Sequence, residues 1–281
     1  MVTQKKVFAL GTKAVAVAFS VLVLGIDGPT LAEQRYITLA STTSTENSGL
    51  FRQILPVYTA GSGVEVRVVA VGTGQAIRLA ANGDADVLLV HHRASEERFV
   101  AEGFGVKRQA VMHNDFVLVG PRHDPAGVAD SKSAGAALTR IAETRSLFAS
   151  RGDDSGTHMA ELSLWRSIEI HPGEASGTWY QEMGAGMGAT LNAAVAMGAY
   201  TLVDRATWSS FANKKSLNIL VEQDPALNNQ YAVILVNPER HPHVKATLGR
   251  SFIEWLLSPA GQAAIAAFRI DGEQVFFPNP D

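Results

Sequence analysis

The most constraining feature of this 281-residue chain is an alternation of short apolar strands with polar turns and helical segments. Residues 36–40, 64–71 and 87–90 are rich in β-branched and aliphatic side chains, which predicts strands. Between them, apolar side chains recur at helical spacing over residues 50–58, and residues 75–81 form a shorter helical segment. Such repeats pack as a sheet with helices on its faces, so an α/β fold is predicted, with ligand-binding turns at the carboxyl ends of the strands.

Two further apolar strands, residues 116–121 and 231–238, each contain a proline near their end, and about half of the predicted mature chain lies between them. We interpret them as two hinge strands that cross between domains. The first domain is then discontinuous and comprises residues 33–121 and 230–281, and the second domain, residues 122–229, is inserted into it. Each domain is predicted to be a sheet flanked by helices.

The first 32 residues have the pattern of a secretory signal peptide. Lys5, Lys6 and Lys13 accompany an apolar stretch over residues 14–26 that is short for a membrane span, and Thr30-Leu31-Ala32 is a small-x-small cleavage pattern. A retained membrane anchor is the less favoured alternative. The chain has no cysteine, so neither a disulfide nor a lipid-bearing N-terminal cysteine is expected. We therefore expect a periplasmic monomer without a membrane anchor.

Charge limits the classes of partner that this chain can bind. The predicted signal peptide carries three lysines and Asp27, so its removal moves the formal net charge from −3 to −5. A chain this acidic, without a basic tract, is a poor candidate for binding nucleic acid. A site for an anion would have to depend on local donors rather than on a broad positive field.

A polar turn in the second predicted domain nevertheless has the composition of an anion site. It follows a short apolar run and precedes a helical segment whose apolar residues fall three apart. The turn offers the fixed charge of Arg151, the hydroxyls of Ser155 and Thr157, and a glycine, Gly156, that lets backbone amides approach a ligand. Amides at a helix start lack internal partners and lie at the positive end of the helix dipole, so they bind small anions.

Two turns in the first predicted domain repeat this logic. Thr42-Thr43-Ser44 and Thr73-Gly74 each follow a predicted strand and open a helix, and each offers hydroxyls and uncapped amides. A ligand that bridges the turns of both domains would lie in the cleft between them, where hinge closure can bury it. The candidate ligand-binding residues are Thr42, Thr43, Ser44, Thr73, Gly74, Arg151, Ser155, Gly156 and Thr157.

Each turn also has a purely structural explanation. Ser155 and the Thr/Ser run would be helix N-caps, and the glycines around Thr73 would make only a tight turn. A dinucleotide fingerprint does not fit, because Ile77 stands where its third small residue belongs, and no cofactor is expected. The occurrence of three such turns in equivalent positions favours the binding interpretation.

The acidic residues bear on the kind of anion. A fully ionised tetrahedral oxyanion has only acceptors, whereas hydrogen phosphate keeps a proton that it can donate to a carboxylate. Asp153 and Asp154 are the only acids inside the three turns, and we expect one of them to orient Arg151. Asp204 and Arg205 are interpreted as a structural ion pair. Because the turns contain only the acids Asp153 and Asp154 and one of them is expected to bind Arg151, the sequence favours an anion without protons.

Several segments together carry a family resemblance that covers nearly the whole predicted mature chain. They are residues 39–50, 71–76, 86–91, 114–121, 150–158, 187–192 and 200–205. They include the run Ser41-Thr42-Thr43-Ser44 and the turn Ser150-Arg151-Gly152-Asp153-Asp154-Ser155-Gly156-Thr157-His158. In these motifs the chain resembles the periplasmic tungstate-binding proteins of tungstate ABC importers, which are type II periplasmic binding proteins.

This resemblance implies a hinged two-domain fold of the type II periplasmic-binding-protein kind, which captures an oxyanion and delivers it to the permease of an ABC transporter. In the family, the Thr/Ser run and the arginine of the second domain contact the oxyanion, so the resemblance assigns this role to Thr42, Thr43, Ser44 and Arg151. Phosphate-binding proteins with a similar turn add Ser155, Gly156 and Thr157. Ser41 departs from the threonine that is usual in the family, so no role is carried over for its side chain. Tungstate is the expected ligand, with molybdate or phosphate as alternatives.

Other chemistries fit the sequence less well. His91 and His92 are adjacent, so on a strand their side chains point to opposite faces and cannot easily share a metal ion. Ser155, His158 and Asp153 could be arranged as a hydrolase triad, but the chain has no Gly-x-Ser-x-Gly elbow. His158 is interpreted as either a donor beside the site or a solvated side chain. We expect no enzyme activity; an exported hydrolase or transferase, or a sensor, is the alternative of a different class.

Overall fold

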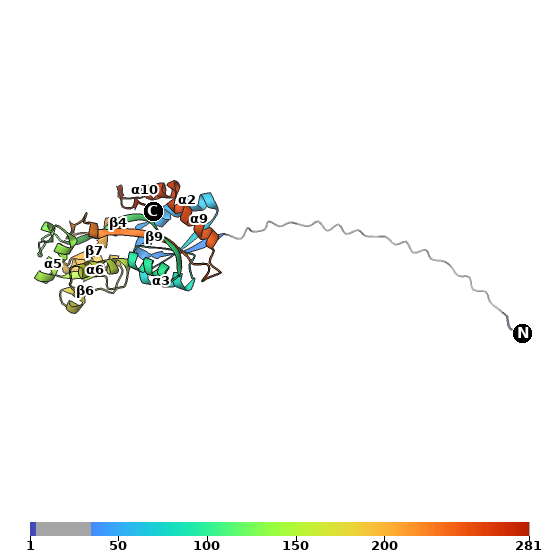
Figure 1. Ribbon diagram of the computed structural model, residues 1–281, viewed down its shortest axis with the longest axis horizontal. Coiled ribbons are helices and arrows are strands. Elements are labelled where there is room, and N and C mark those ends of the chain that lie inside the picture. The colour runs from blue at the N-terminus through green and yellow to red at the C-terminus, as the bar shows by residue number, and fades with distance from the viewer. Residues whose placement is uncertain (4–34, 281) are drawn as a thin grey trace. The chain divides into compact units, whose positions relative to one another are not determined.

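The computed structural model describes residues 1–3 and 35–280, so most of the predicted signal peptide lies outside the described residues. After Arg35 the chain alternates strands and helices, as predicted (Figure 1). The first elements are β1 (Tyr36–Thr42), α1 (Thr43–Ser48), α2 (Leu50–Ser62), β2 (Glu65–Val71), α3 (Thr73–Asn82), β3 (Val87–Val90) and α4 (Arg93–Ala101).

Strand pairing brings the first two candidate turns side by side. Strand β1 pairs in parallel with β2 on one side and with β3 on the other. In this register Thr42 lies opposite Val71, and Ser41 lies opposite Leu89. The carboxyl ends of the three strands therefore meet at one edge of the sheet, which positions the turns that follow them in one row.

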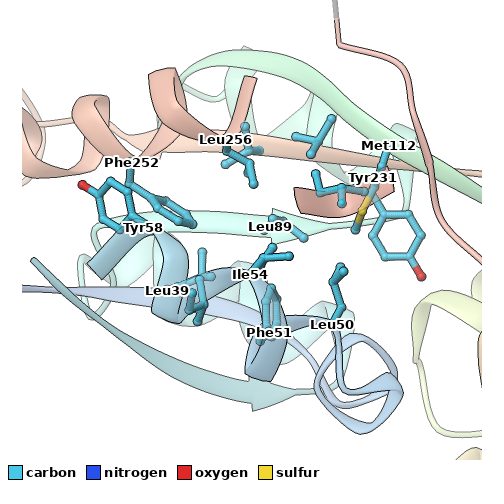
Figure 2. Packing of buried hydrophobic residues seen from close by; sticks show 14 of the residues in the cluster. Leu39, Leu50, Phe51, Ile54, Tyr58, Leu89, Met112, Tyr231, Phe252 and Leu256 are labelled. Carbon is cyan, nitrogen blue, oxygen red and sulfur yellow. The ribbon is translucent and has the colours of Figure 1, made fainter. Parts of the chain in front are cut away.

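Helix α2 buries the face that the sequence predicted. Its apolar residues pack beneath the sheet and against the C-terminal helix α9 (Ala246–Leu257), as Figure 2 shows for Leu39 of the sheet and Phe252 of α9. The buried residues of α2 are Leu50, Phe51, Ile54, Leu55 and Tyr58. Pro56 lies inside this helix at an exposed position, and the helix continues past it although its nitrogen cannot donate a backbone hydrogen bond.

Two long antiparallel strands, β4 (Gly105–Pro121) and β9 (Asn228–Val236), connect the two halves of the structure. Figure 1 shows them between the elements around α3 and α9 and those around α5 and α6. The first part of β4 pairs with β9, whereas its last residues pair with β7 (Thr201–Asp204) and β8 (Leu217–Val221). Strand β4 is thus much longer than the predicted strand 116–121, because its polar first half is held by cross-strand pairing rather than by an apolar run.

The second lobe is formed by the elements between β4 and β9. They are η1 (Val128–Asp130), α5 (Ala134–Thr144), β5 (Phe148–Ser150), α6 (Gly156–Ser167), η2 (Pro172–Ala175), β6 (Tyr180–Glu182), α7 (Met187–Met197), β7, α8 (Arg205–Ser210), β8 and η3 (Pro225–Leu227). Two apolar clusters of its own fill this lobe, one around Trp165 and one around Leu191. The predicted two-domain α/β fold is therefore confirmed, while the domain limits 33–121 with 230–281 and 122–229 stay a prediction.

The chain ends in the first lobe. Helix α10 (Pro259–Ala266) follows α9, and the short strands β10 (Arg269–Ile270), β11 (Glu273–Gln274) and β12 (Phe277–Pro278) complete the chain. Strand β12 adds to the outer edge of β4. Among the described residues, no helix combines the length and the apolar character needed to cross a membrane.

A buried carboxylate ties together the elements beneath the third candidate turn. Glu161 of α6 accepts hydrogen bonds from the hydroxyls of Ser150 and Tyr180, at 2.7 Å each, and from the indole nitrogen of Trp165 at 3.1 Å. These donors come from β5, β6 and α6, so the carboxylate fixes where the turn after β5 begins. Burial raises the pKa of Glu161 to about 7, although the three hydrogen bonds act in the opposite direction.

Replacing Gly120 with alanine is expected to destabilise the second lobe. A Cβ at this position of β4 would overlap the ring of Tyr200 and lie 2.9 Å from Cδ1 of Leu220. We expect Gly120→Ala to lower the free energy of unfolding by about 1–3 kcal/mol, measured by urea denaturation with tryptophan fluorescence. The matched control is Gly61→Ala in α2, where a Cβ meets no atom within 4 Å and the helix should gain roughly 0.5–1 kcal/mol. Equal midpoints for the two variants would contradict this account.

The buried Glu161 should make stability depend on pH. Its pKa of about 7 in the folded protein exceeds the model-peptide value of 4.5, so the folded state binds the proton more tightly. Stability should therefore fall as the pH rises from 4.5 to about 7, by at most about 3 kcal/mol, and not change further above that window. Glu161→Gln removes this titration. The difference in unfolding free energy between wild type and variant should vary across this window, and parallel pH curves would refute the assignment.

Candidate functional site

The first candidate turn is built around a helix N-cap. Strand β1 ends at Thr42, whose Oγ1 accepts a hydrogen bond from the amide of Thr45 at 3.4 Å. The same oxygen lies 3.0 Å from the Oγ of Ser44 and 2.8 Å from the Oγ1 of Thr45. The side chain of Ser41 is not part of this turn, because its hydroxyl donates to the carbonyl of Leu89 at 2.7 Å. Three hydroxyls thus form one connected group at the start of α1.

The second candidate turn leaves its donors uncapped. Gly72 precedes α3 in an extended conformation and has no side chain to cap the first amides of the helix. Thr73, the first residue of α3, is buried, and its Oγ1 has no hydrogen-bond partner among the described residues. Gly74 lies against the third turn, since a Cβ there would be 3.9 Å from the carbonyl oxygen of Asp154.

The third candidate turn holds a buried guanidinium. Arg151 is only 5% exposed, and its Nη2 donates to Oδ2 of Asp153 at 2.6 Å. Burial opposes ionisation of Asp153, but the hydrogen bonds from Ser155 and the charge of Arg151 outweigh it and lower the pKa of this carboxyl. The prediction that an acid of this turn orients Arg151 is therefore confirmed for Asp153, whereas the side chain of Asp154 is exposed.

The start of α6 combines a cap with a close contact to the first lobe. Ser155 caps the helix by accepting from the amide of His158 at 3.3 Å. A Cβ on the next residue, Gly156, would lie 2.6 Å from Cε1 of His91 and 2.9 Å from Oγ1 of Thr73. Only glycine lets the helix start approach the first lobe this closely. Thr73, His91 and Gly156 therefore meet at one point between the lobes.

His91 is a site residue that sequence reasoning weighed only as a metal ligand. It follows β3 directly, is 5% exposed, and its Nε2 lies 3.3 Å from the Oγ of Ser44. Its Nδ1 lies 3.0 Å from Oδ1 of Asn229. The neighbouring His92 turns to Ser95 of α4 instead, at 2.7 Å. The position of His91 at the carboxyl end of a buried strand was the signal that could have identified it.

A cavity of about 430 Å³ opens between the first and third turns. Thr43, Ser44 and Arg151 line it together with the start of α7, whose N-terminal Gly186 gives no side-chain cap. The remaining lining residues are Asn47, Met187, Gly188, Ala189, Thr207, Ser210 and Phe211. A larger cavity of about 610 Å³ lies beside Arg205, but there the guanidinium is already bonded to two carboxylates.

Several buried hydrogen-bonding atoms of the third turn, of the start of α6 and of Thr73 have no partner in the described part of the chain. Four side-chain atoms have no partner among the described residues: Thr73 Oγ1, Arg151 Nε, Thr157 Oγ1 and His158 Nε2. Because Nδ1 of His158 accepts the amide of Asp154 at 3.1 Å, a neutral ring carries its proton on Nε2 and donates there. Each unpartnered buried group is unfavourable by about 1–3 kcal/mol, so this arrangement suits a ligand made of acceptors.

One prediction about the residues near the site is wrong, and one of the two alternatives for His158 is excluded. Asp204 and Arg205 do not pair with each other: Arg205 donates twice to Asp115, at 2.6 Å each, and once to Glu222 at 2.7 Å. Asp204 is buried and caps α8 through Thr207, because adjacent residues at a strand end point in different directions. His158 is 6% exposed, so its interpretation as a solvated side chain also fails.

The residues considered for catalysis do not form a triad. The ring of His158 accepts from the backbone amide of Asp154, and only its own backbone amide bonds the Oγ of Ser155. Asp153 is engaged by Arg151 and by the amide of Ser155. In the part of the chain that the structure describes, no three His, Asp or Glu residues are grouped to hold a metal ion.

Comparison with known proteins places this geometry in a family. The PBP superfamily domain matches residues 28–260. The chain is 46% identical over 247 residues to the tungstate-binding protein TupA of Peptoclostridium acidaminophilum, covering 86% of this chain and 85% of that protein.

Two solved structures support the same family assignment. The tungstate-binding protein TupA from Desulfovibrio alaskensis G20 matches with a TM-score of 0.78 and 44% identity over 88% of this chain and all of that one. The structure described as the tungstate ABC transporter from Geobacter sulfurreducens matches with a TM-score of 0.75 and 45% identity, covering 83% of this chain and 98% of that one. The chain therefore belongs to the PBP superfamily and, within it, to the family of these tungstate-binding proteins.

Proposed function

We propose that this protein is the solute-binding component of an ABC importer and captures a tetrahedral oxyanion, tungstate, in the cleft between its lobes. One observation carries the proposal: among the described residues, buried and unpartnered donors gather at the starts of α3 and α6, and they include the guanidinium of Arg151, which Asp153 fixes. The names of the relatives support tungstate over other oxyanions. Hand-over to a permease follows from the same relationship.

The proposed ligand contacts divide between side chains and backbone. Arg151, Thr73 and Thr157 offer side-chain donors that are otherwise unsatisfied. Thr42 and Ser155 already serve as caps, so we propose that they act by orienting the free amides of the helix starts. The complete proposed set is Thr42, Thr43, Ser44, Thr73, Gly74, Arg151, Ser155, Gly156 and Thr157.

Phosphate is the alternative ligand, and the acids around the site weigh against it. A hydrogen phosphate would need a free carboxylate oxygen to accept its proton. Both oxygens of Asp153 already accept hydrogen bonds, and Asp204 accepts two from Thr207. Molybdate has the same charge and shape as tungstate, so the same donors would serve it.

The cellular setting is proposed from the sequence and the family. Residues 1–32 would act as a signal peptide, and the mature chain would be a periplasmic monomer without a membrane anchor. Residues 33–121 with 230–281 and residues 122–229 would be the two domains that close on the anion. No enzymatic role is proposed, because His158 and Ser155 lack the geometry of a base and its nucleophile.

Removing the guanidinium should affect binding far more than removing a nearby hydroxyl. Arg151→Ala deletes the only fixed cation of the three turns and should weaken tungstate binding at least about 100-fold, measured by isothermal titration calorimetry. Ser41→Ala is the matched control, since its hydroxyl is bonded to Leu89 and should matter for stability, by about 1 kcal/mol, rather than for affinity. Similar affinity losses from the two variants would count against the proposed site.

A panel of oxyanions should separate the possible ligands. We expect the protein without residues 1–32 to bind one tungstate ion tightly and reversibly, to bind molybdate, and to bind phosphate and sulfate weakly or not at all. The physical reason is a site rich in buried donors, in which both oxygens of Asp153 already accept hydrogen bonds and the side chain of Asp154 is exposed to solvent. Preferential binding of phosphate would overturn the choice of ligand, and failure to bind any of the four ions would overturn the proposed function.

A further inference from the structure

His91 occupies a position that links both lobes. Its ring stacks on Tyr231 of β9, with centroids 4.7 Å apart, and its edge faces Gly156 of the second lobe. Its two nitrogens contact Ser44 of the first turn and Asn229 of β9. An apolar ring of similar size would fill the same space but would leave Oδ1 of Asn229 without a donor.

The donors and acceptors around His91 determine which atom donates in each of its hydrogen bonds. The amide nitrogen of Asn229 donates to Oδ1 of Asn114 at 2.7 Å, so its Oδ1 is left as an acceptor for His91. The Nδ1 of His91 therefore carries a proton and donates it to Asn229 at 3.0 Å. In a neutral ring the Nε2 is then an acceptor, and the Ser44 hydroxyl donates to it at 3.3 Å.

This direction conflicts with binding an anion that has only acceptors. The single hydroxyl proton of Ser44 cannot be donated both to His91 and to the anion. The hydroxyl of Thr42 lies in the same connected group, between Ser44 and Thr45, and is also shared internally. The hydroxyl of Ser44 becomes available only if Nε2 of His91 acquires a proton and becomes the donor.

We propose that His91 is a positioning residue that takes up one proton on Nε2 when a doubly charged oxyanion enters the site, which turns the hydroxyl of Ser44 towards the anion. This inference rests on the proposed function. The proton comes from the buffer, and no other bond is broken: Nδ1 keeps its proton and its bond to Asn229, and Nε2–H donates to the Oγ of Ser44.

The charges around the ring explain why the proton arrives with the anion. Burial is the main cause that lowers the pKa of His91, to about 4, and the charges of Arg151 and His92 add to it, although the hydrogen bond to Asn229 acts in the opposite direction. The start of α6 at Gly156 also presents the positive end of its dipole to the ring. Asp204, a buried acid that interacts with Arg151 and with Tyr231, is bonded to Thr207. Because Arg151 is already neutralised by Asp153, a dianion brings two uncompensated negative charges that a protonated His91 partly balances.

The first test measures proton uptake during binding. Tungstate is titrated calorimetrically into the wild-type protein in pairs of buffers with different ionisation enthalpies, between about pH 8 and about pH 5. We expect uptake to rise towards one proton per anion as the pH falls, and affinity to increase by up to about tenfold per pH unit. Binding without proton uptake across this range would refute the inference but leave the proposed function standing, whereas absence of tungstate binding would overturn both.

The second test assigns the proton to His91. His91→Gln should lose the uptake and the pH dependence of affinity, while the matched control His92→Gln, whose side chain points to Ser95, should keep both. Because a buried variant can fold poorly, the ¹⁵N spectrum of the wild-type imidazole provides an independent measurement. We expect only Nδ1 of His91 to be protonated in the empty protein and both nitrogens after saturation with tungstate. An Nε2 that stays unprotonated, or a neutral ring protonated on Nε2 alone, would refute the proposal.

Discussion

The site depends first on the pairing of β4 with β9. These strands run side by side from Gly105 to Asp115, and β4 then continues into the sheet of the second lobe. Because both lobes are built on the same strand, their helix starts face each other across a defined gap. Asn114 and Asn229 lie within this pairing and bond each other at 2.7 Å, so the residue that holds His91 belongs to a strand that connects the lobes.

The starts of three helices offer hydrogen-bond donors for an anion, although the net charge of the protein is negative. The chain is acidic overall, so we propose that it binds its anion through amides, hydroxyls and one buried guanidinium rather than through a positive surface. Several of these donors are left unpartnered at a cost in folding free energy. Such a cost is the expected signature of a site prepared for a ligand, and Glu161 beneath the third turn contributes to holding it in place.

The proposed protonation of His91 would let a neutral, donor-based site respond to a charged ligand. The ring lies between Asn229 and Ser44 and close to Gly156, so it contacts both the first turn and the start of α6. The direction of the hydrogen bond between Ser44 and His91 determines whether the Ser44 hydroxyl can donate to an anion. A site of this kind can couple the charge of its ligand to the protonation of one side chain and to closure of the cleft.

The sequence by itself determined the elements and the local chemistry of this protein. The buried face of α2, the buried strand β3, the turns that open α1, α3 and α6, and the pairing of Arg151 with an acid of its own turn all follow from patterns within a few residues, whereas the structure identified that acid as Asp153. Only the tertiary structure decided the length of β4, the partners of Arg205, the bond from Ser41 to Leu89 and the place of His91. The physical reason is that each of these depends on strand register between segments 17 or more residues apart, which no local pattern encodes.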